Sequence, residues 1–405
     1  MSAHDDQRSP DTRGVQVLVW IGIVLLALNL RPAAVSVGPV LAEIVADLQL
    51  SGVEAGILTS LPVLAFAGFG ALTPRLAHVI GPHRLTLIAL IAATGGMLGR
   101  SLVSNTGLFL TLTLVALSGM ASANVLMPSL IKRHFPDQIG LMTAVYSTTL
   151  AVGLTAASVL TVPIAEHYGG WRYGLAAWAV MGALAVLPWL GLIAHDRPDA
   201  VSVSDPQISL LAVARTRLGW LMAVFFGIQS FHAYVIFGWF ASLYRSAGFS
   251  SSDAGLLLGV ITGIGIPLSF LVPALSTRQR LQLPMLNVLV ACYVAGYVGL
   301  LVAPAQGAVA WALLVGVGTS TFPLILTLIG LHAHTAAGTA ALSGFTQSVG
   351  YLIAATGPFL IGMLHELTEG WTVPLVVLIV LTVPLFWVGA LVTRPDAIED
   401  HLPTA

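Results

Sequence analysis

Twelve long apolar runs, separated by short segments with charged or turn-forming residues, limit most strongly how this chain can fold. Each run has about 20 residues or more, the length that an α-helix needs to cross the hydrocarbon core of a bilayer. None shows the alternation of apolar and polar residues that is typical of membrane β-strands. We therefore expect an all-α membrane protein with transmembrane helices near residues 17–42, 52–77, 83–103, 106–131, 139–165, 171–193, 218–244, 252–276, 283–303, 306–331, 338–364 and 371–393.

The composition agrees with a membrane protein and argues against other classes. Hydrophobic residues make up 57% of the chain and charged residues 8%, whereas a soluble domain carries about a quarter charged residues. The net charge of −1 points to no nucleic-acid partner, and Cys292 is the only cysteine. The sequence has no phosphate-binding loop, nucleophile elbow or zinc-binding helix. We therefore expect no enzyme activity, no metal and no cofactor.

The distribution of basic residues predicts the orientation in the membrane. An even number of spans puts both termini on one side. If that side is the cytoplasm, only Arg100, Arg172 and Arg245 of the 16 Lys and Arg residues fall outside, and Arg31 lies within a span. The remaining twelve are cytoplasmic, so the positive-inside rule favours an N-in, C-in topology.

The polar segment 194–217 is the longest between two runs and falls at the midpoint of the chain. It predicts a cytoplasmic linker between two bundles of six helices each. The expected organisation is then a cytoplasmic N-terminal tail at 1–16, an N-terminal bundle at 17–193, the linker at 194–217, a C-terminal bundle at 218–393 and a cytoplasmic tail at 394–405.

An internal repeat relates the two bundles. Short motifs recur at an offset of 199 or 200 residues: Trp20 with Trp220, Glu54-Ala55-Gly56 with Asp253-Ala254-Gly255, Pro74 with Pro273, Gly119 with Gly318, and Gly170-Trp171 with Gly370-Trp371. Because each unit has six spans, both units have the same orientation. Parallel six-helix repeats are the pattern of the major facilitator superfamily. The segment Gly70–Arg84 resembles a degenerate form of that superfamily's signature, with Thr73 and Pro74 near the place of its usual acidic residue.

Two further motifs resemble one branch of that superfamily. Leu28–Pro32, followed by Ser36–Leu41, resembles the first helix of the cyanate/2-nitroimidazole permease family. Glu54–Pro62 resembles its second helix. The resemblance implies the major facilitator fold, a central site between the bundles and alternating access. It also implies a substrate such as a cyanate-like anion or a small nitro-heterocycle.

Arg31 is the residue of the spans that most suggests function. It lies near the middle of the first span, where an arginine costs roughly 2.5–3.5 kcal/mol on insertion scales, so we expect it to face a water-filled cavity or the bundle interior. Pro32 removes a backbone hydrogen bond and disfavours helix at the preceding residue, which predicts a discontinuous first helix. A guanidinium at such a break suits a small anion or planar polar group. The alternative is a structural arginine that binds backbone carbonyl groups.

Other polar residues of the spans are candidates for the same site. Arg31 corresponds to Phe231 in the repeat, and His232 beside it could bind substrate, carry a proton or be held by a neighbour as a buried histidine. Asn29 corresponds to Gln229, and Ser147 to Gln347. The expected substrate-binding set is Arg31, Asn29, Gln229, His232, Tyr146, Ser147, Gln347 and Asn124.

Several other patterns predict structure rather than chemistry. Glycines spaced by four residues let helices approach closely. Such stripes occur at Gly95 and Gly99 and at Gly255, Gly259 and Gly263. Prolines within spans predict kinks at Pro267, Pro323 and Pro358. The pair His332 and His334 has the spacing of metal ligands, but without a third ligand it is better explained as a solvated turn.

Together these features predict a secondary active transporter of a small polar solute, either a cyanate-like anion or a small nitro-heterocycle, across the inner membrane by alternating access, with Arg31 as central anchor. None of the 17 acidic residues falls in the middle of a span, which argues against cationic drugs as substrates. A drug or metabolite efflux transporter of the same superfamily is the alternative. A proton is the candidate coupling ion. We expect a monomer whose partners are the solute and the lipid bilayer.

Overall fold

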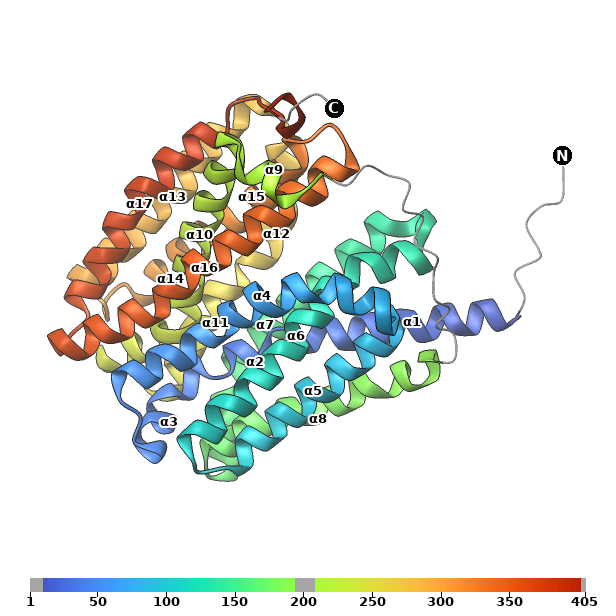
Figure 1. Cartoon of the computed structure of the whole chain (residues 1–405). Helices are drawn as coiled ribbons and strands as arrows, with labels where there is room; N and C mark the ends of the chain where they lie inside the picture. Colours follow the sequence, from blue (N-terminus) through green and yellow to red (C-terminus); the bar gives the residue numbers. More distant parts are fainter. Residues whose placement is uncertain (1–9, 194–207, 402–405) are drawn as a thin grey trace, which may run out of the picture.

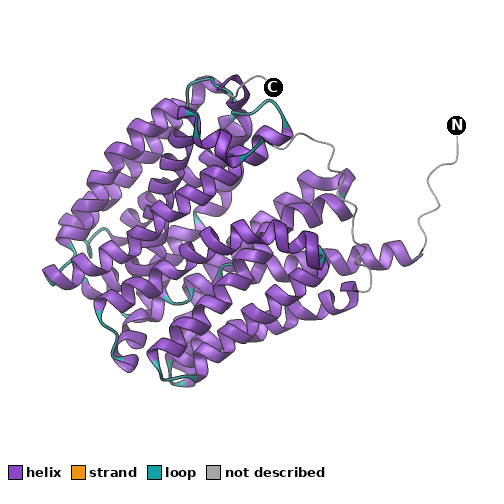
Figure 2. Cartoon of the chain, viewed as in Figure 1, coloured by secondary structure: helices purple, strands orange, loops and turns teal. Residues whose placement is uncertain are grey.

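The computed structural model describes residues 10–193 and 208–401, and its regular elements are all helical (Figure 2). Twelve helical segments are long and apolar enough to cross a membrane. This confirms the predicted fold class, with boundaries that differ by a few residues. Residues 1–9 of the expected N-terminal tail, 194–207 of the linker and 402–405 of the C-terminal tail lie outside the described residues.

The helices fall into two groups of six spans, which lie on either side of a central region (Figure 1). The first group consists of α1 (Pro10–Asn29), α2 (Pro32–Val35), η1 (Gly38–Val40), α3 (Leu41–Leu48), α4 (Gly52–Ile80), α5 (Pro82–Leu102), α6 (Thr106–His134), η2 (Pro136–Gln138), α7 (Ile139–Tyr168) and α8 (Trp171–Leu192). The second consists of α9 (Leu210–Ala214), α10 (Arg217–Ser246), α11 (Ser251–Gly263), α12 (Gly265–Ser276), α13 (Gln279–Val302), α14 (Ala308–Gly318), α15 (Thr321–Leu331), α16 (Ala336–Thr368), α17 (Thr372–Val392) and η4 (Ile398–His401).

Among the spans that the described residues form, three are interrupted. The first span comprises α1, α2, η1 and α3, as the Arg31-Pro32 pair predicts. The eighth is divided between α11 and α12, and the tenth between α14 and α15, with Pro267 and Pro323 in the first turn of the second piece. Pro358, in contrast, lies inside α16, which has no interruption. Proline alone therefore does not break a span here.

The repeated Glu54 and Asp253 motifs have the same local role. Ser51 is the N-cap of α4, where its hydroxyl accepts a hydrogen bond from Glu54 N at 3.2 Å. Ser250 is the N-cap of α11, where its hydroxyl accepts one from Asp253 N at 3.1 Å. Such caps satisfy backbone donors that a helix start leaves free. The internal repeat thus preserves two equivalent helix starts.

The two halves meet through α4 against α16 and through α7 against α11. The glycine of each repeated motif makes this contact possible. A Cβ built on Gly56 would lie 3.1 Å from the Cα of Phe359, and one on Gly255 would lie 2.9 Å from the backbone oxygen of Ser158. The predicted stripe on the eighth span therefore packs against the first half.

These contacts lie at one end of the molecule. We call it the far end: it carries α3 and the turn between α16 and α17, opposite the termini end, where α1 begins and α17 ends. At the far end Glu43 of α3 accepts a hydrogen bond at 2.6 Å from Arg245 of α10, so an ion pair also joins the halves there. The ribbons of the halves diverge toward the termini end (Figure 1).

The glycine stripe predicted on the third span is only partly correct. Gly95 is exposed, and a Cβ on it would meet no atom within 4 Å. The packing glycine is its neighbour Gly96, which is buried against α6. A Cβ built on Gly96 would lie 2.6 Å from Leu112 O and 2.6 Å from Ala116 N. Gly99 meets the side chain of Leu112 at 3.2 Å. Adjacent helical residues point about 100° apart, so spacing alone did not identify the packed face.

We predict that Gly96→Ala destabilises the protein and Gly95→Ala does not. Overpacking a close helix contact costs typically 1–3 kcal/mol, whereas alanine at the exposed position only restricts the unfolded chain. Thermal unfolding of the detergent-solubilised variants measures the difference. Equal unfolding temperatures for the two variants would contradict this packing.

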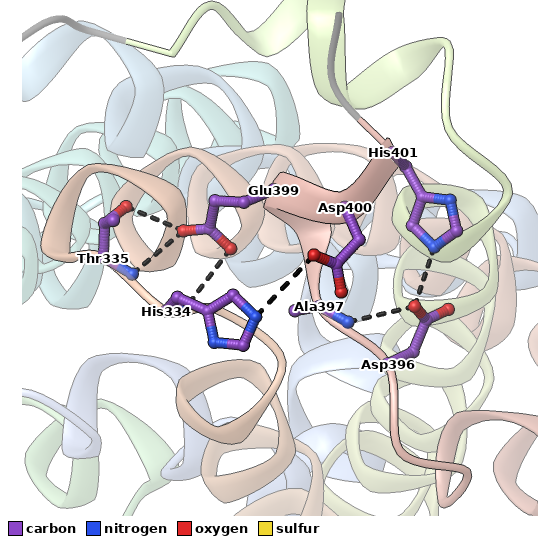
Figure 3. A network of polar contacts seen from close by, with 7 residues as sticks. All are labelled: His334, Thr335, Asp396, Ala397, Glu399, Asp400 and His401. Atoms are coloured by element: carbon purple, nitrogen blue, oxygen red, sulfur yellow. Dashed lines mark hydrogen bonds and ion pairs between the residues drawn. The ribbon is translucent and has the colours of Figure 1, made fainter. Parts of the chain in front are cut away.

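The C-terminal segment binds the turn that precedes α16 (Figure 3). One carboxylate oxygen of Glu399 in η4 accepts hydrogen bonds from Thr335 N at 2.9 Å and Thr335 Oγ1 at 2.7 Å, and the other accepts one from His334 N at 3.0 Å. Partial burial acts to raise the pKa of Glu399, but these hydrogen bonds outweigh it and lower the pKa to about 2. The carboxylate also places negative charge at the start of α16, which favours the helix.

The turn at His332 and His334 is therefore bound by the C-terminal segment. The sequence had suggested a freely solvated turn. His332 is 2% exposed, and its Nε2 lies 3.0 Å from the backbone oxygen of Arg394. Ile398 N also donates a hydrogen bond to His332 O at 2.9 Å. The returning C-terminal segment covers this turn, which local sequence spacing does not reveal.

Candidate functional site

Arg31 lies at the break in the first span. Helix α1 ends at Asn29, and α2 begins at Pro32. The Arg31 carbonyl accepts hydrogen bonds from Ala34 N at 3.1 Å and Val35 N at 3.0 Å, so Arg31 is the residue on which α2 starts. Its side chain retains partial exposure between buried neighbours. The break thus directs one guanidinium into the space between the halves.

Aromatic side chains from both halves surround this guanidinium. Its Cζ lies 5.6 Å from the ring centroid of Phe66 on α4, within the range of a cation–π contact. The phenol groups close to it are those of Tyr234 on α10, Tyr351 on α16 and Tyr146 on α7. Two of these tyrosines belong to the second half, so the site is shared between the bundles.

The same aromatic groups pack on one another. Phe66 and Tyr351 stack with centroids 5.5 Å apart, and this pair joins α4 to α16 across the interface. Tyr351 also meets Phe226 edge to face at 5.0 Å. Tyr234 contacts Tyr351 at 6.4 Å and Phe237 at 6.0 Å. Movement of one half against the other must therefore change the surroundings of Arg31.

No carboxylate balances the charge of Arg31 among the described residues. The electrostatic partners of its guanidinium are tyrosines, and the ion pairs of the described residues involve other cations. A charge held away from bulk water without a counterion is costly. An anion that binds here would supply the missing charge.

The route from Arg31 to the far end is closed. The space lined by Gly38, Thr59, Tyr234 and Phe237, among others, has a volume of about 10 Å³, room for one water at most. A Cβ on Gly38 would lie 2.1 Å from the backbone oxygen of Phe237, so η1 packs directly against α10. The two halves are therefore in close contact between Arg31 and the far end in this conformation.

Of the predicted site residues, Tyr146 lies beside Arg31 and contacts a second one, Asn124. Tyr146 acts on the guanidinium, and its hydroxyl donates a hydrogen bond at 2.5 Å to Asn124 Oδ1 on α6. Ser147 follows Tyr146 on α7 and is half-buried. Gln347 is half-buried on α16, one turn before Tyr351, and donates to Ser343 Oγ at 2.7 Å.

The other three predicted residues lie inside their own bundles. Asn29 is fully buried, and its amide is 3.5 Å from Leu25 O. Gln229 is fully buried and donates to Ser230 Oγ at 2.6 Å. His232 stacks on Tyr293 and Tyr297 of α13, with its Nδ1 3.0 Å from the Tyr297 hydroxyl. Within the described residues, none of the three contacts Arg31, so the structure does not bring them to its site.

Sequence reasoning missed Phe66 and Tyr351. Tyr351 had a usable signal, because it is one helical turn from Gln347 and so lies on the same face of its span. Phe66 had none, since an apolar residue in an apolar span carries no sign of its neighbour.

A shared site between two six-span halves, with a closed far end, is the architecture of an alternating-access transporter. The sequence model of the Major Facilitator Superfamily matches residues 19–355, most of the chain. The chain belongs to the Major Facilitator Superfamily. This major facilitator protein is a multi-pass transporter of the bacterial inner membrane and not an enzyme.

Similar proteins indicate to which branch of the superfamily this chain is related. The chain is 37% identical to the uncharacterized transporter YycB of Bacillus subtilis (strain 168), covering 89% of this chain and 90% of that protein. It is 34% identical to the 2-nitroimidazole transporter of Escherichia coli (strain K12), over 95% and 97% of the two chains. It is 28% identical to the cyanate transport protein CynX of the same organism, over 86% and 90%. These likenesses confirm the predicted resemblance to the cyanate/2-nitroimidazole permeases.

Solved structures agree with the fold. A bacterial homologue of the human lysosomal transporter Spinster, in an inward-facing and unoccupied conformation, matches with a TM-score of 0.75 at 15% identity, over 98% of this chain and 99% of that one. A nucleoside transporter NupG variant matches with a TM-score of 0.77 at 12% identity, over 93% of this chain and 100% of that one. At such identities the likeness concerns the fold alone.

Proposed function

We propose that this transporter carries a small anion, or a small planar polar molecule, bound to Arg31 between the two halves. The observation that carries the proposal is an arginine without a carboxylate partner among the described residues, enclosed by aromatic side chains from both bundles. A bound anion would neutralise the guanidinium. Because α4, α7, α10 and α16 all contribute to the site, binding would be sensitive to the arrangement of the halves.

The site also suggests the shape of the solute. The Phe66 and Tyr351 rings offer flat surfaces, and the Tyr234 and Tyr146 hydroxyls are polar groups close to the guanidinium. A compact solute with a delocalised negative charge or a nitro group would use both features. Cyanate and 2-nitroimidazole, the compounds after which two relatives are named, are such molecules. A transporter of cationic drugs would instead need a carboxylate here, so we do not propose drug efflux.

We also propose that the termini lie in the cytoplasm, as the positive-inside rule favours. This conformation is then closed to the outside. The transporter would alternate with a state in which the contacts of Gly38, Gly56 and Gly255 separate. For a coupled proton, His232 is the candidate carrier, since its Nε2 is buried and has no partner among the described residues.

Ligand binding to the purified transporter tests the proposal. We expect cyanate or 2-nitroimidazole to raise the unfolding temperature, because a ligand at 100 times its Kd stabilises the folded state by about 2.7 kcal/mol. The organic cation tetraphenylphosphonium should not. Uptake of the stabilising ligand into proteoliposomes, with and without an imposed pH gradient, then shows whether a proton is coupled. Stabilisation by the cation and not by any small anion or nitro-heterocycle would overturn the proposed substrate class.

A further inference from the structure

Arg100 is a second arginine buried in the first half. It lies in the last turn of α5, is 0% exposed and is among the largest fully buried side chains of the molecule. Its Nη1 donates a hydrogen bond to Ala33 O at 2.9 Å, and its Nη2 donates one to Ser36 Oγ at 3.3 Å. Both acceptors belong to the short stretch of the first span that directly follows Arg31.

The burial of Arg100 is costly. Its Nε has no partner, and within the described residues no carboxylate pairs with it. Replacement of a buried charged group by an apolar side chain of similar size is often neutral or stabilising. Packing of α5 therefore does not by itself explain an arginine at this position, and the contacts of its guanidinium point to the explanation.

The break in the first span creates a need that Arg100 meets. Helix α2 ends at Val35, and Ser36 N, its last backbone donor, binds Pro32 O at 3.0 Å. Among the described residues, no backbone N–H continues this ladder to the Ala33 carbonyl. A buried carbonyl left without a donor destabilises the fold, because it loses its hydrogen bonds to water without replacement. The guanidinium of Arg100 supplies the donor for Ala33.

A second contact fixes the chain on the other side of Arg31. A Cβ on Gly153 of α7 would lie 2.2 Å from the backbone oxygen of Leu28, so α7 presses on the end of α1. The Arg31 backbone is thus held between α7 at Leu28 and α5 at Ala33 and Ser36. Without Arg100, only one of these two supports would remain.

We propose that Arg100 is a positioning residue, which holds the interrupted first span through Ala33 and Ser36 and so directs the Arg31 guanidinium into the solute site. The inference rests on the proposed function, since it takes Arg31 as the anchor. Arg100 itself does not touch the solute. Its effect on binding should therefore depend on the presence of Arg31.

A double-mutant cycle tests this dependence. Cyanate binding is measured for the wild type, Arg100→Met, Arg31→Lys and the double variant. We expect Arg100→Met to raise the Kd at least about 10-fold alone but less than about twofold when Arg31→Lys is already present, because residues in one network are not additive. Arg100→Lys, which keeps the positive charge on a single donor nitrogen, should recover part of the affinity. Ser36→Ala removes one acceptor and should give a smaller loss of the same sign without endangering the fold.

Arg172→Met is the matched control. Arg172 also donates a hydrogen bond to a backbone oxygen, that of Val103 at 2.9 Å, but it does not contact the interrupted segment of the first span. A second readout needs no solute. In a Cys292→Ser background, the thiol of Arg31→Cys should change its labelling rate about 10-fold or more on Arg100→Met and not on Arg172→Met. An unchanged Kd and labelling rate, or an equal loss of affinity in both backgrounds, would overturn the inference. If Arg31→Lys itself leaves the Kd unchanged, the proposed function fails instead.

Discussion

Arg31→Lys is expected to weaken solute binding at least about 30-fold, and Arg31→Met to abolish measurable transport. Loss of one partner from a buried charge pair costs about 2–5 kcal/mol, which corresponds to roughly 30-fold to several-thousand-fold in Kd. Lysine keeps the charge but loses the planar fork that binds an anion through two hydrogen bonds and stacks on the Phe66 ring. Uptake into proteoliposomes and ligand-induced thermal shifts measure the two effects.

Removal of Arg31 should weaken solute binding but should not lower the unfolding temperature of the ligand-free protein. Because Arg31 has no carboxylate partner among the described residues, its removal relieves an uncompensated charge, and the unfolding temperature of ligand-free Arg31→Met should equal or exceed that of the wild type. The anion should then no longer raise it. A structural arginine would give the reverse result, a lower unfolding temperature with binding retained. Arg217→Lys, at an exposed arginine at the start of α10, is the control.

The sequence predicted those features of the site that depend on how deep a residue lies in the membrane. The cost of a charge at mid-span identified Arg31, and its proline neighbour predicted the break. Depth does not give the direction of a side chain around its helix. Asn29 precedes Arg31 by two residues, and His232 precedes Tyr234 by two, a rotation of about 200° in each case. Both therefore point into their own bundle, away from the face that carries the site residue.

The burial of Arg100 and the packing of Gly96 in place of Gly95 escaped the sequence analysis for a related reason. The position of Arg100 near a loop predicted its side of the membrane but not its buried side chain, whose acceptors lie in the folded first span. The face of α5 that meets α6 includes Gly96 and not Gly95. In both cases the decisive neighbour is more than ten residues away in the chain. Local spacing carries no information about such a neighbour.

Gly38→Val is expected to abolish transport by preventing closure of the far end. In the closed conformation a Cβ on Gly38 would lie 2.1 Å from the Phe237 backbone oxygen. A Cβ on Gly238, which corresponds to Gly38 in the internal repeat, would lie 3.0 Å from Thr59 Cβ. A valine side chain cannot fit against a backbone oxygen at that distance, and backbone does not yield as a flexible side chain does. The state open at the far end lacks this contact, so the variant should populate it.

Thiol accessibility measures the shift in population. In a Cys292→Ser background, the thiol of Thr59→Cys lies in the closed space of about 10 Å³ beside Gly38 and should react slowly with a membrane-impermeant maleimide. Addition of Gly38→Val should raise that rate by an order of magnitude or more. Gly68→Ala is the matched control, because a Cβ there meets no atom within 4 Å. Wild-type transport by Gly38→Val would mean that the halves close without this contact. Loss of transport with an unchanged labelling rate would place the defect elsewhere than in closure of the far end.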